Sequence, residues 1–191
     1  MIFVTFHNEN ELPVYSNDQS SDSGLLLIKE FAAKIGFTKL IKKKFKTNDK
    51  SIRFHKDHEN LLQMIYQIIS AYFQDDCEDE LTLDPVFNVI LDKESLASQP
   101  TLSRFFNRMD EDTLVQFDDI DKNLRDIIYS IKCPEHVLLD LDSTLFGTYG
   151  RQEGEGFNFH YQAHGYHPLL CYDGLTGDLI KAELRDGTLY C

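Results

Sequence analysis

The chain has 191 residues and a formal net charge of −13; 42% of its residues are hydrophobic and 27% are charged. This composition is typical of a soluble globular protein with room for one domain, or for a helical domain and part of another. A strongly acidic protein binds polyanions poorly in a non-specific way. The charge is uneven, however: residues 1–60 hold ten Lys and Arg against eight Asp and Glu, whereas residues 61–191 hold nine against 24.

The cysteines and the N-terminus bear on the cellular compartment. Cys77, Cys133, Cys171 and Cys191 are far apart and form no Cys-x-x-Cys pair. Such spacing indicates reduced thiols rather than a disulfide framework or a zinc knuckle. The N-terminus lacks the basic region and apolar length of a signal peptide, and no apolar run is long enough to cross a membrane. The sequence therefore predicts a cytoplasmic protein with no membrane partner.

The first two thirds of the chain read as an arm followed by helices. Residues 1–23 are polar after a short β-like start, and we expect them to form an N-terminal arm. Between residues 24 and 133, apolar residues recur in several stretches every three or four positions, which predicts an all-helical region. The acidic run 75–80 lacks the spacing of a calcium loop and is expected to be a solvated loop. The expected helices are 25–35 closed by Gly36, 60–74, a short one capped by Asp84-Pro85, one with Pro100 in its first turn, and one from Asp110 to just before Pro134.

Two segments of the helical region carry candidate DNA-binding residues. One is a basic run whose ammonium groups could contact backbone phosphates, although a solvated helix face is the alternative. The other is residues 96–108, in which short polar groups and arginines would face outward, as in a recognition helix. Many amphipathic helices share that second pattern. In the basic run, which extends from Lys39 to Lys46 and is closely followed by Arg53 and Lys56, the candidates are Lys42, Lys43 and Lys44. In residues 96–108 the candidates are Thr101, Ser103, Arg104 and Arg108, opposite the inward-facing Leu102, Phe105 and Phe106.

The segment 136–150 has a different character. Its apolar run predicts a buried strand, in which Asp140 and Asp142 share one face. Two carboxylates on one face repel each other and are costly to desolvate, and a hard divalent cation is the simplest way to stabilise them. The strand is therefore a candidate Mg²⁺ site for phosphoryl-transfer chemistry. The alternative is a strand that runs off the edge of a sheet, with both carboxylates in water. The apolar residues are Val137, Leu138, Leu139 and Leu141.

The remaining residues read as further strands. Residues 168–172 and 179–185 predict two strands joined as a hairpin by the turn-rich segment 173–178. Residues 157–161 alternate in a strand-like way. Histidines at 160, 164 and 167 lack the spacing of zinc ligands, so we expect no zinc site there.

The motif Asp140-Leu-Asp142-Ser-Thr144-Leu145 is similar to the signature of the haloacid-dehalogenase-like phosphatases. That resemblance would make Asp140 a nucleophile and Asp142 a general acid and base. Members of that family complete the site with a downstream Ser or Thr, a Lys and a further acidic pair, all on a doubly wound sheet. The residues after the motif read instead as consecutive hairpin strands without those partners.

A second resemblance extends over nearly the whole chain. The chain resembles the DDE transposases of bacterial insertion sequences, in the group-one DDE domain subgroup. Several ordered motifs over such a span are more specific than one short strand, so we prefer this interpretation. The matching segments are 21–31, 66–72 leading into acidic residues, 84–87, 96–108, 140–144, and 165–168 continuing to Arg185.

The resemblance implies an α+β fold with a helical, DNA-binding region at 24–133. Residues 135–191 would then form the start of a ribonuclease-H-like catalytic domain, opening with three antiparallel strands and truncated. In this family an Asp-Asp-Glu triad holds Mg²⁺ or Mn²⁺ for DNA cleavage and strand transfer. Asp142 best matches the first catalytic carboxylate and metal ligand, and Asp140 is a second candidate on the same face.

The resemblance also implies partners. These are DNA with the terminal inverted repeats of an insertion sequence and, at full length, a second copy of the protein; the location would be the nucleoid. No second Asp or terminal Glu follows in a plausible place before Cys191, so we expect this polypeptide alone to be an inactive fragment. The remaining alternative is a helical DNA-binding module without catalysis.

Overall fold

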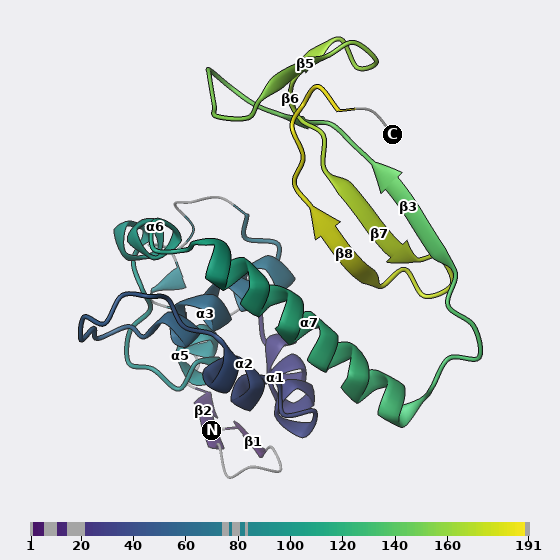
Figure 1. Cartoon of the computed structure of the whole chain (residues 1–191). Helices are drawn as coiled ribbons and strands as arrows, with labels where there is room; N and C mark the ends of the chain where they lie inside the picture. The colour runs from purple at the N-terminus through teal and green to yellow at the C-terminus, as the bar shows by residue number, and fades with distance from the viewer. Residues whose placement is uncertain are drawn as a thin grey trace. The chain divides into compact units, whose positions relative to one another are not determined.

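A computed structural model describes residues 2–5, 11–14, 22–73, 77, 81–82 and 84–189, with side chains from residue 22 onward (Figure 1). The chain forms two compact units, Met1–Ile120 and Asp121–Cys191. The first is mainly helical and the second contains two antiparallel sheets, so the predicted α+β class is confirmed. Within the described ranges, no helix is long and apolar enough to span a membrane.

The helices of the first unit follow the apolar periodicity of the sequence. A two-stranded antiparallel sheet, β1 (Ile2–Thr5) with β2 (Glu11–Val14), precedes them. The acidic run at 75–80 lies outside the described residues except for Cys77. The helices are α1 (Leu25–Lys34), α2 (Phe37–Lys44), α3 (Asp57–Ile69), α5 (Pro85–Ile90), α6 (Gln99–Phe106) and α7 (Glu111–Ile131), which continues into the second unit.

Local capping chemistry sets the helix ends. The Asp84 carboxylate accepts hydrogen bonds from the backbone N–H groups of Val86 (2.7 Å) and Phe87 (3.3 Å), as predicted for a cap before Pro85. Gly36 adopts a left-handed φ of 74° and ends α1, also as predicted.

The second predicted helix is displaced in the structure. It begins at Asp57 rather than at residue 60 and ends at Ile69 rather than at residue 74. The backbone N–H of Lys56 donates to the Glu59 carboxylate at 3.0 Å, which fixes the earlier start. At the other end Ala71 takes a φ of 64°, and the N–H of Tyr72 donates to the Gln67 carbonyl at 2.9 Å. These bonds close the last turn before the apolar pattern stops.

Two apolar clusters hold the first unit together. Phe45, which follows α2, packs against Phe105 and Phe117 with ring centroids 5.9 Å and 5.1 Å away. Phe106, predicted to face inward beside Phe105, is instead 51% exposed, because it lies about 100° further round the helix, at the rim of this cluster. The other cluster is formed by Leu25, Tyr66, Leu81, Val86, Phe87, Ile90 and Leu96.

The second unit contains two three-stranded antiparallel sheets, in the orders β3-β7-β8 and β4-β6-β5. The first matches the predicted strand and hairpin. The second was predicted only at β5. The single strand predicted within 136–150 ends at Ser143, since Phe146 pairs in the other sheet. The strands are β3 (Leu139–Ser143), β4 (Phe146–Gly147), β5 (Gly156–Asn158), β6 (Ala163–Tyr166), β7 (Leu169–Asp173) and β8 (Leu179–Glu183).

The buried carboxylate of Asp173 links the start of β3 to the β7–β8 hairpin by hydrogen bonds. Asp173 is 1% exposed, and its side chain accepts hydrogen bonds from the N–H groups of Leu138 (3.3 Å) and Leu175 (3.0 Å). The N–H of Gly174 in turn donates to the Leu138 carbonyl at 2.7 Å. The turn between β7 and β8 therefore also fixes where β3 begins.

The prediction that this strand is buried is wrong. Leu139 and Leu141 are 58% and 59% exposed, and the flanking Val137 and Leu138 are exposed as well. The reason is that β3 lies at the edge of its sheet, where it pairs with β7 alone. An apolar run indicates a strand, but its burial depends on what packs against it.

Candidate functional site

The acidic face of β3 is the first candidate site. Asp140 and Asp142 alternate with leucines along the strand, so both carboxylates lie on one face of the sheet, and both residues are exposed. In the antiparallel register their partners on β7 are Tyr172 and Leu170. The backbone N–H of Ser143 donates to Asp142 Oδ1 at 2.8 Å, which orients that carboxylate.

The chemistry of this face fits a divalent cation in part. Carboxylate oxygens are the donors that Mg²⁺ and Mn²⁺ prefer. Across the ladder, however, the neighbouring side chains are aromatic or apolar and add no carboxylate. No group of three or more His, Cys, Asp or Glu side chains is placed to hold a metal ion in the ranges that the structure describes. The pair therefore supplies part of a ligand set.

The basic run forms much of α2. Lys42 and Lys43 are exposed on the helix surface, whereas the Lys44 ammonium lies 2.6 Å from the Asp119 carboxylate. Of these three predicted DNA-binding lysines, the first two therefore present their charge to solvent and the third is engaged within the unit.

The predicted recognition helix is α6. Ser103 and Arg104 are exposed on it, as expected for residues that contact DNA. Thr101 is half-buried, and its hydroxyl shares a 3.1 Å hydrogen bond with the hydroxyl of Ser98.

Arg108 is placed differently from the other candidates. Its Nη2 lies 2.9 Å from Asp57 Oδ1, and its Nη1 donates to the Arg104 carbonyl at 3.0 Å. The guanidinium carbon also lies 5.5 Å from the centre of the Phe105 ring. Its side chain is only 13% exposed, so the Arg108 charge is used inside the first unit.

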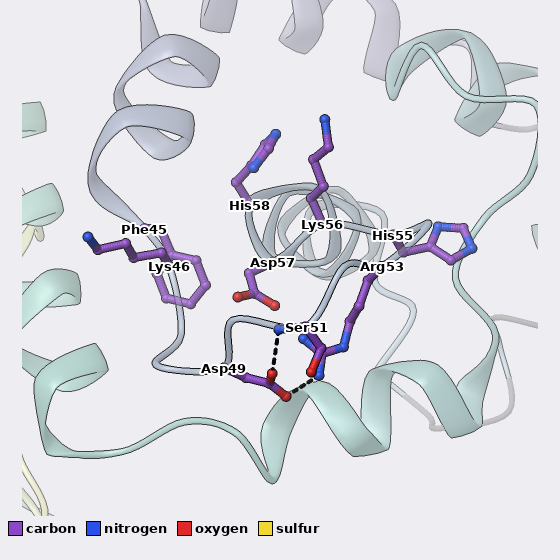
Figure 2. A pocket seen from close by; sticks show the side chains of 9 residues that line it. All are labelled: Phe45, Lys46, Asp49, Ser51, Arg53, His55, Lys56, Asp57 and His58. Atoms are coloured by element: carbon purple, nitrogen blue, oxygen red, sulfur yellow. Dashed lines mark hydrogen bonds and ion pairs between the residues drawn. The ribbon is translucent and has the colours of Figure 1, made fainter.

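A pocket of about 210 Å³ lies between the end of α2 and the start of α3 (Figure 2). The Asp49 carboxylate accepts a 2.8 Å hydrogen bond from the Ser51 N–H and pairs with Arg53. Hydrogen bonds from Ser51, followed by the interactions with Arg53, hold the pKa of Asp49 well below its ordinary value. The lining residues are Phe45, Lys46, Asp49, Ser51, Arg53, His55, Lys56, Asp57 and His58.

Two histidines of this pocket have lowered pKa values. Burial is the main cause for both. His55 also faces the Lys93 ammonium, which lies 2.8 Å from its Nδ1, and His58 faces the positive charges of Lys42, Lys56 and Lys93. His58 was not predicted as a site residue; the available signal was its position just after the basic run and before the apolar residues of α3.

Comparison with known proteins identifies the family. A model of the family described as Transposase DDE domain group 1 matches residues 12–191. The chain belongs to this transposase family. Neither the comparison with curated proteins nor that with solved structures gave a match.

The transposase match covers both units, as the resemblance of several ordered motifs predicted. It gives the chain a function in the movement of DNA, for which this family generally uses divalent metal ions. The two alternatives gain no support. The phosphatase motif would belong on a doubly wound sheet, but β3 is an antiparallel edge strand, and a purely helical module does not account for a match that reaches residue 191.

Proposed function

We propose that this transposase domain takes part in metal-dependent cleavage and transfer of DNA strands at the ends of an insertion sequence. The observation that carries the proposal is the pair of exposed carboxylates, Asp140 and Asp142, on one face of β3. The antiparallel order β3-β7-β8 supports the assignment of residues 135–191 to the opening sheet of a ribonuclease-H-like domain.

In this proposal Asp142 is the first catalytic carboxylate and a ligand of Mg²⁺ or Mn²⁺. Asp140 is the second candidate for that role, on the same face. Bound divalent cations supply charge stabilisation for the attacking and leaving oxygens of a phosphodiester. The hydrogen bond from the Ser143 N–H holds the Asp142 carboxylate in one orientation and leaves its second oxygen free of that bond.

The helical region 24–133 is proposed to bind the terminal inverted repeats, with residues 1–23 as an arm. Lys42, Lys43, Ser103 and Arg104 are exposed and suited to contact the DNA backbone and bases. Thr101, Lys44 and Arg108 already have partners within the unit, and we assign them a supporting role. The transposase would act as a homodimer at the nucleoid.

A polypeptide of these 191 residues is expected to be inactive by itself, because the acidic pair lacks a third ligand among the described residues. A nicking assay tests this, with Mg²⁺ or Mn²⁺ and DNA carrying the inverted repeats that flank the gene for this chain. We expect no metal-dependent nick above background. Clear cleavage that Asp142→Asn abolishes would contradict the expectation of inactivity and support the catalytic assignment.

Metal binding tests the assignment without activity. Mn²⁺ is paramagnetic, so low concentrations should broaden the amide signals of residues 140–143 before others. We expect Asp142→Asn and Asp140→Asn to weaken this broadening, whereas Asp126→Asn, an exposed acid in the same unit, should not. Equal broadening in all three variants would contradict the proposed metal site.

A further inference from the structure

Two lysines and a histidine come together where α3 begins. Lys56 precedes the helix and His58 lies in its first turn, and Figure 2 shows both side chains pointing to the same side of the pocket. The Lys42 side chain of α2 lies close enough for its charge to act on His58, as does that of Lys56. Residues of α2 and of the start of α3 thus form one basic cluster, Lys42, Lys56 and His58.

The two lysine charges of this cluster have no ion-pair partner among the described residues. Lys42 and Lys56 are both exposed. Other lysines of the first unit are paired: Lys29 with Asp92, Lys44 with Asp119 and Lys93 with Glu59.

The two acidic residues beside the cluster have other strong partners, although Glu59 Oε1 also lies 3.9 Å from His58 Nε2. Asp57 Oδ2 accepts hydrogen bonds from Thr47, and Oδ1 pairs with Arg108; in Figure 2 this carboxylate points away from Lys56 and His58. The Glu59 carboxylate lies 2.7 Å from the Lys93 ammonium and 3.0 Å from the backbone nitrogen of Lys56. The cluster therefore presents positive charge at the N-terminal end of a helix of 13 residues, where the helix dipole adds to it.

We infer that Lys42, Lys56 and His58 form a binding site for a phosphate group of the DNA backbone. The inference rests on the DNA binding proposed above and extends it from α2 to the first turn of α3. Two lysines, a ring N–H and the positive end of the α3 dipole are together suited to the tetrahedral oxygens of a phosphodiester.

Proton uptake should accompany binding. Burial lowers the pKa of His58, and the positive charges of Lys42, Lys56 and Lys93 lower it further, whereas the negative charge of Glu59 raises it. The net effect is a pKa below the ordinary value of 6.5, so the ring is largely neutral at pH 7 in the free protein. A phosphate held beside the ring would favour the protonated form. The affinity for DNA should therefore rise as the pH falls from about 7.5 to about 6, where histidines titrate.

The first test is the salt dependence of binding to a mixed-sequence DNA duplex by the whole chain. We expect Lys42→Gln and Lys56→Gln each to lower the slope of log Kd against log salt by about 1. The matched control is Lys122→Gln, an exposed lysine on α7, which should leave the slope unchanged. Thermal unfolding checks that all three variants remain folded.

The outcomes separate this inference from the proposal on which it rests. If the unmodified chain binds the duplex with a salt-dependent affinity, but Lys42→Gln and Lys56→Gln behave like the control, the site is wrong and DNA binding stands. If the unmodified chain shows no salt-dependent binding, DNA binding by this region is wrong and the site falls with it.

The second test follows the ring signals of His58 by NMR as the pH is changed. Addition of the duplex should raise the pKa of His58, and His58→Gln should flatten the pH dependence of the affinity. Inorganic phosphate alone distinguishes the source of the ligand. If inorganic phosphate raised the pKa of His58 but the duplex did not, the site would be one for free anions and the DNA assignment would be overturned. If neither raised this pKa, the site itself would be overturned.

Discussion

Arg108 Nη2 lies 2.9 Å from Asp57 Oδ1, and this ion pair joins the residues after α6 to the first turn of α3. The other carboxylate oxygen of Asp57 accepts hydrogen bonds from the hydroxyl (2.6 Å) and the backbone N–H (3.0 Å) of Thr47. One carboxylate thus connects the first turn of α3 with the segment that follows α2 and with the segment that follows α6. An arginine whose pattern suggested contact with DNA is instead part of the internal structure of the first unit.

Replacement of Arg108 by methionine should lower the free energy of unfolding by about 2 kcal/mol, because the largely buried Asp57 carboxylate loses its charged partner. Arg104→Met, at an exposed position on α6, should change it by no more than about 0.5 kcal/mol. Urea unfolding measures both. The order of the two variants should reverse for DNA binding: Arg104→Met should lose more affinity for DNA than Arg108→Met. Equal stability of the two variants would contradict the structural role of Arg108.

The same carboxylate should make the first unit sensitive to acid. Burial raises the pKa of Asp57, but the hydrogen bonds from Thr47 and the hydrogen bond and charge of Arg108 outweigh it, so the pKa lies below the ordinary value of 3.8. The unfolded chain therefore binds this proton more readily than the folded one. The stabilisation is present above pH 3.8 and is lost as the pH falls from there through the folded pKa.

Asp57→Asn isolates this effect from that of the other carboxylates. Urea midpoints at pH 6, 4 and 3 should fall less steeply for the variant than for the unmodified chain, although the variant starts lower at pH 6. Parallel curves for the two proteins would show that the carboxylate does not titrate as stated.

Two buried glutamines of α3 provide a matched pair. Gln63 Nε2 donates to the Ala97 carbonyl at 2.9 Å, and the Ala97 N–H donates to Gln63 Oε1 at 2.8 Å. Gln63→Met leaves both backbone groups without a partner and should cost about 2–4 kcal/mol of stability. Gln67 is equally buried, but its Nε2 has no hydrogen-bond partner among the described residues, so Gln67→Met should change stability by no more than about 1 kcal/mol. Thermal and urea unfolding of the two variants compare them directly.

The small β4-β6-β5 sheet depends on Gly165. A Cβ atom at this position would lie 2.2 Å from the Phe146 carbonyl oxygen, which is backbone and cannot move aside without separating β4 from β6. Gly165→Ala should therefore destabilise the second unit by about 2–3 kcal/mol. Amide hydrogen exchange should show faster exchange along β6.

Gly147→Ala is the control for this prediction. It lies on the neighbouring strand opposite Gly165, and nothing is within 4 Å of a Cβ atom there. The variant should keep the exchange pattern of the unmodified chain. If both glycine variants exchanged alike, the close approach at Gly165 would not matter for the sheet.

Much of the fold could be predicted from the sequence, because local sequence patterns determine many of its helices and turns. Apolar periodicity and caps such as Asp84 and Gly36 located the helices other than α2, which was offered only as an alternative interpretation of the basic run. Turn residues at 173–178 located the hairpin that pairs with β3. The strands β4 and β6 were missed, since two to four residues rich in Gly and His carry no alternation that could be recognised.

The errors concern long-range relationships. The local sequence around Arg108 does not indicate its pairing with a residue 51 positions away, so the residue was predicted to contact DNA. Phe106 and the leucines of β3 were expected to be buried because they are apolar, but burial depends on neighbours that local patterns do not specify. The acidic pair itself could be identified, because the alternation of side chains along a strand is local.

The position of β3 at the edge of its sheet has a practical consequence. Its outer N–H and C=O groups face no other strand among the described residues, and Leu139 and Leu141 stand exposed beside them. A strand of this kind is a template for a strand from another molecule. Concentrated samples of the purified polypeptide should therefore self-associate through this edge. DNA-binding constants should be measured at concentrations where light scattering shows monomers, so that they are not affected by this aggregation.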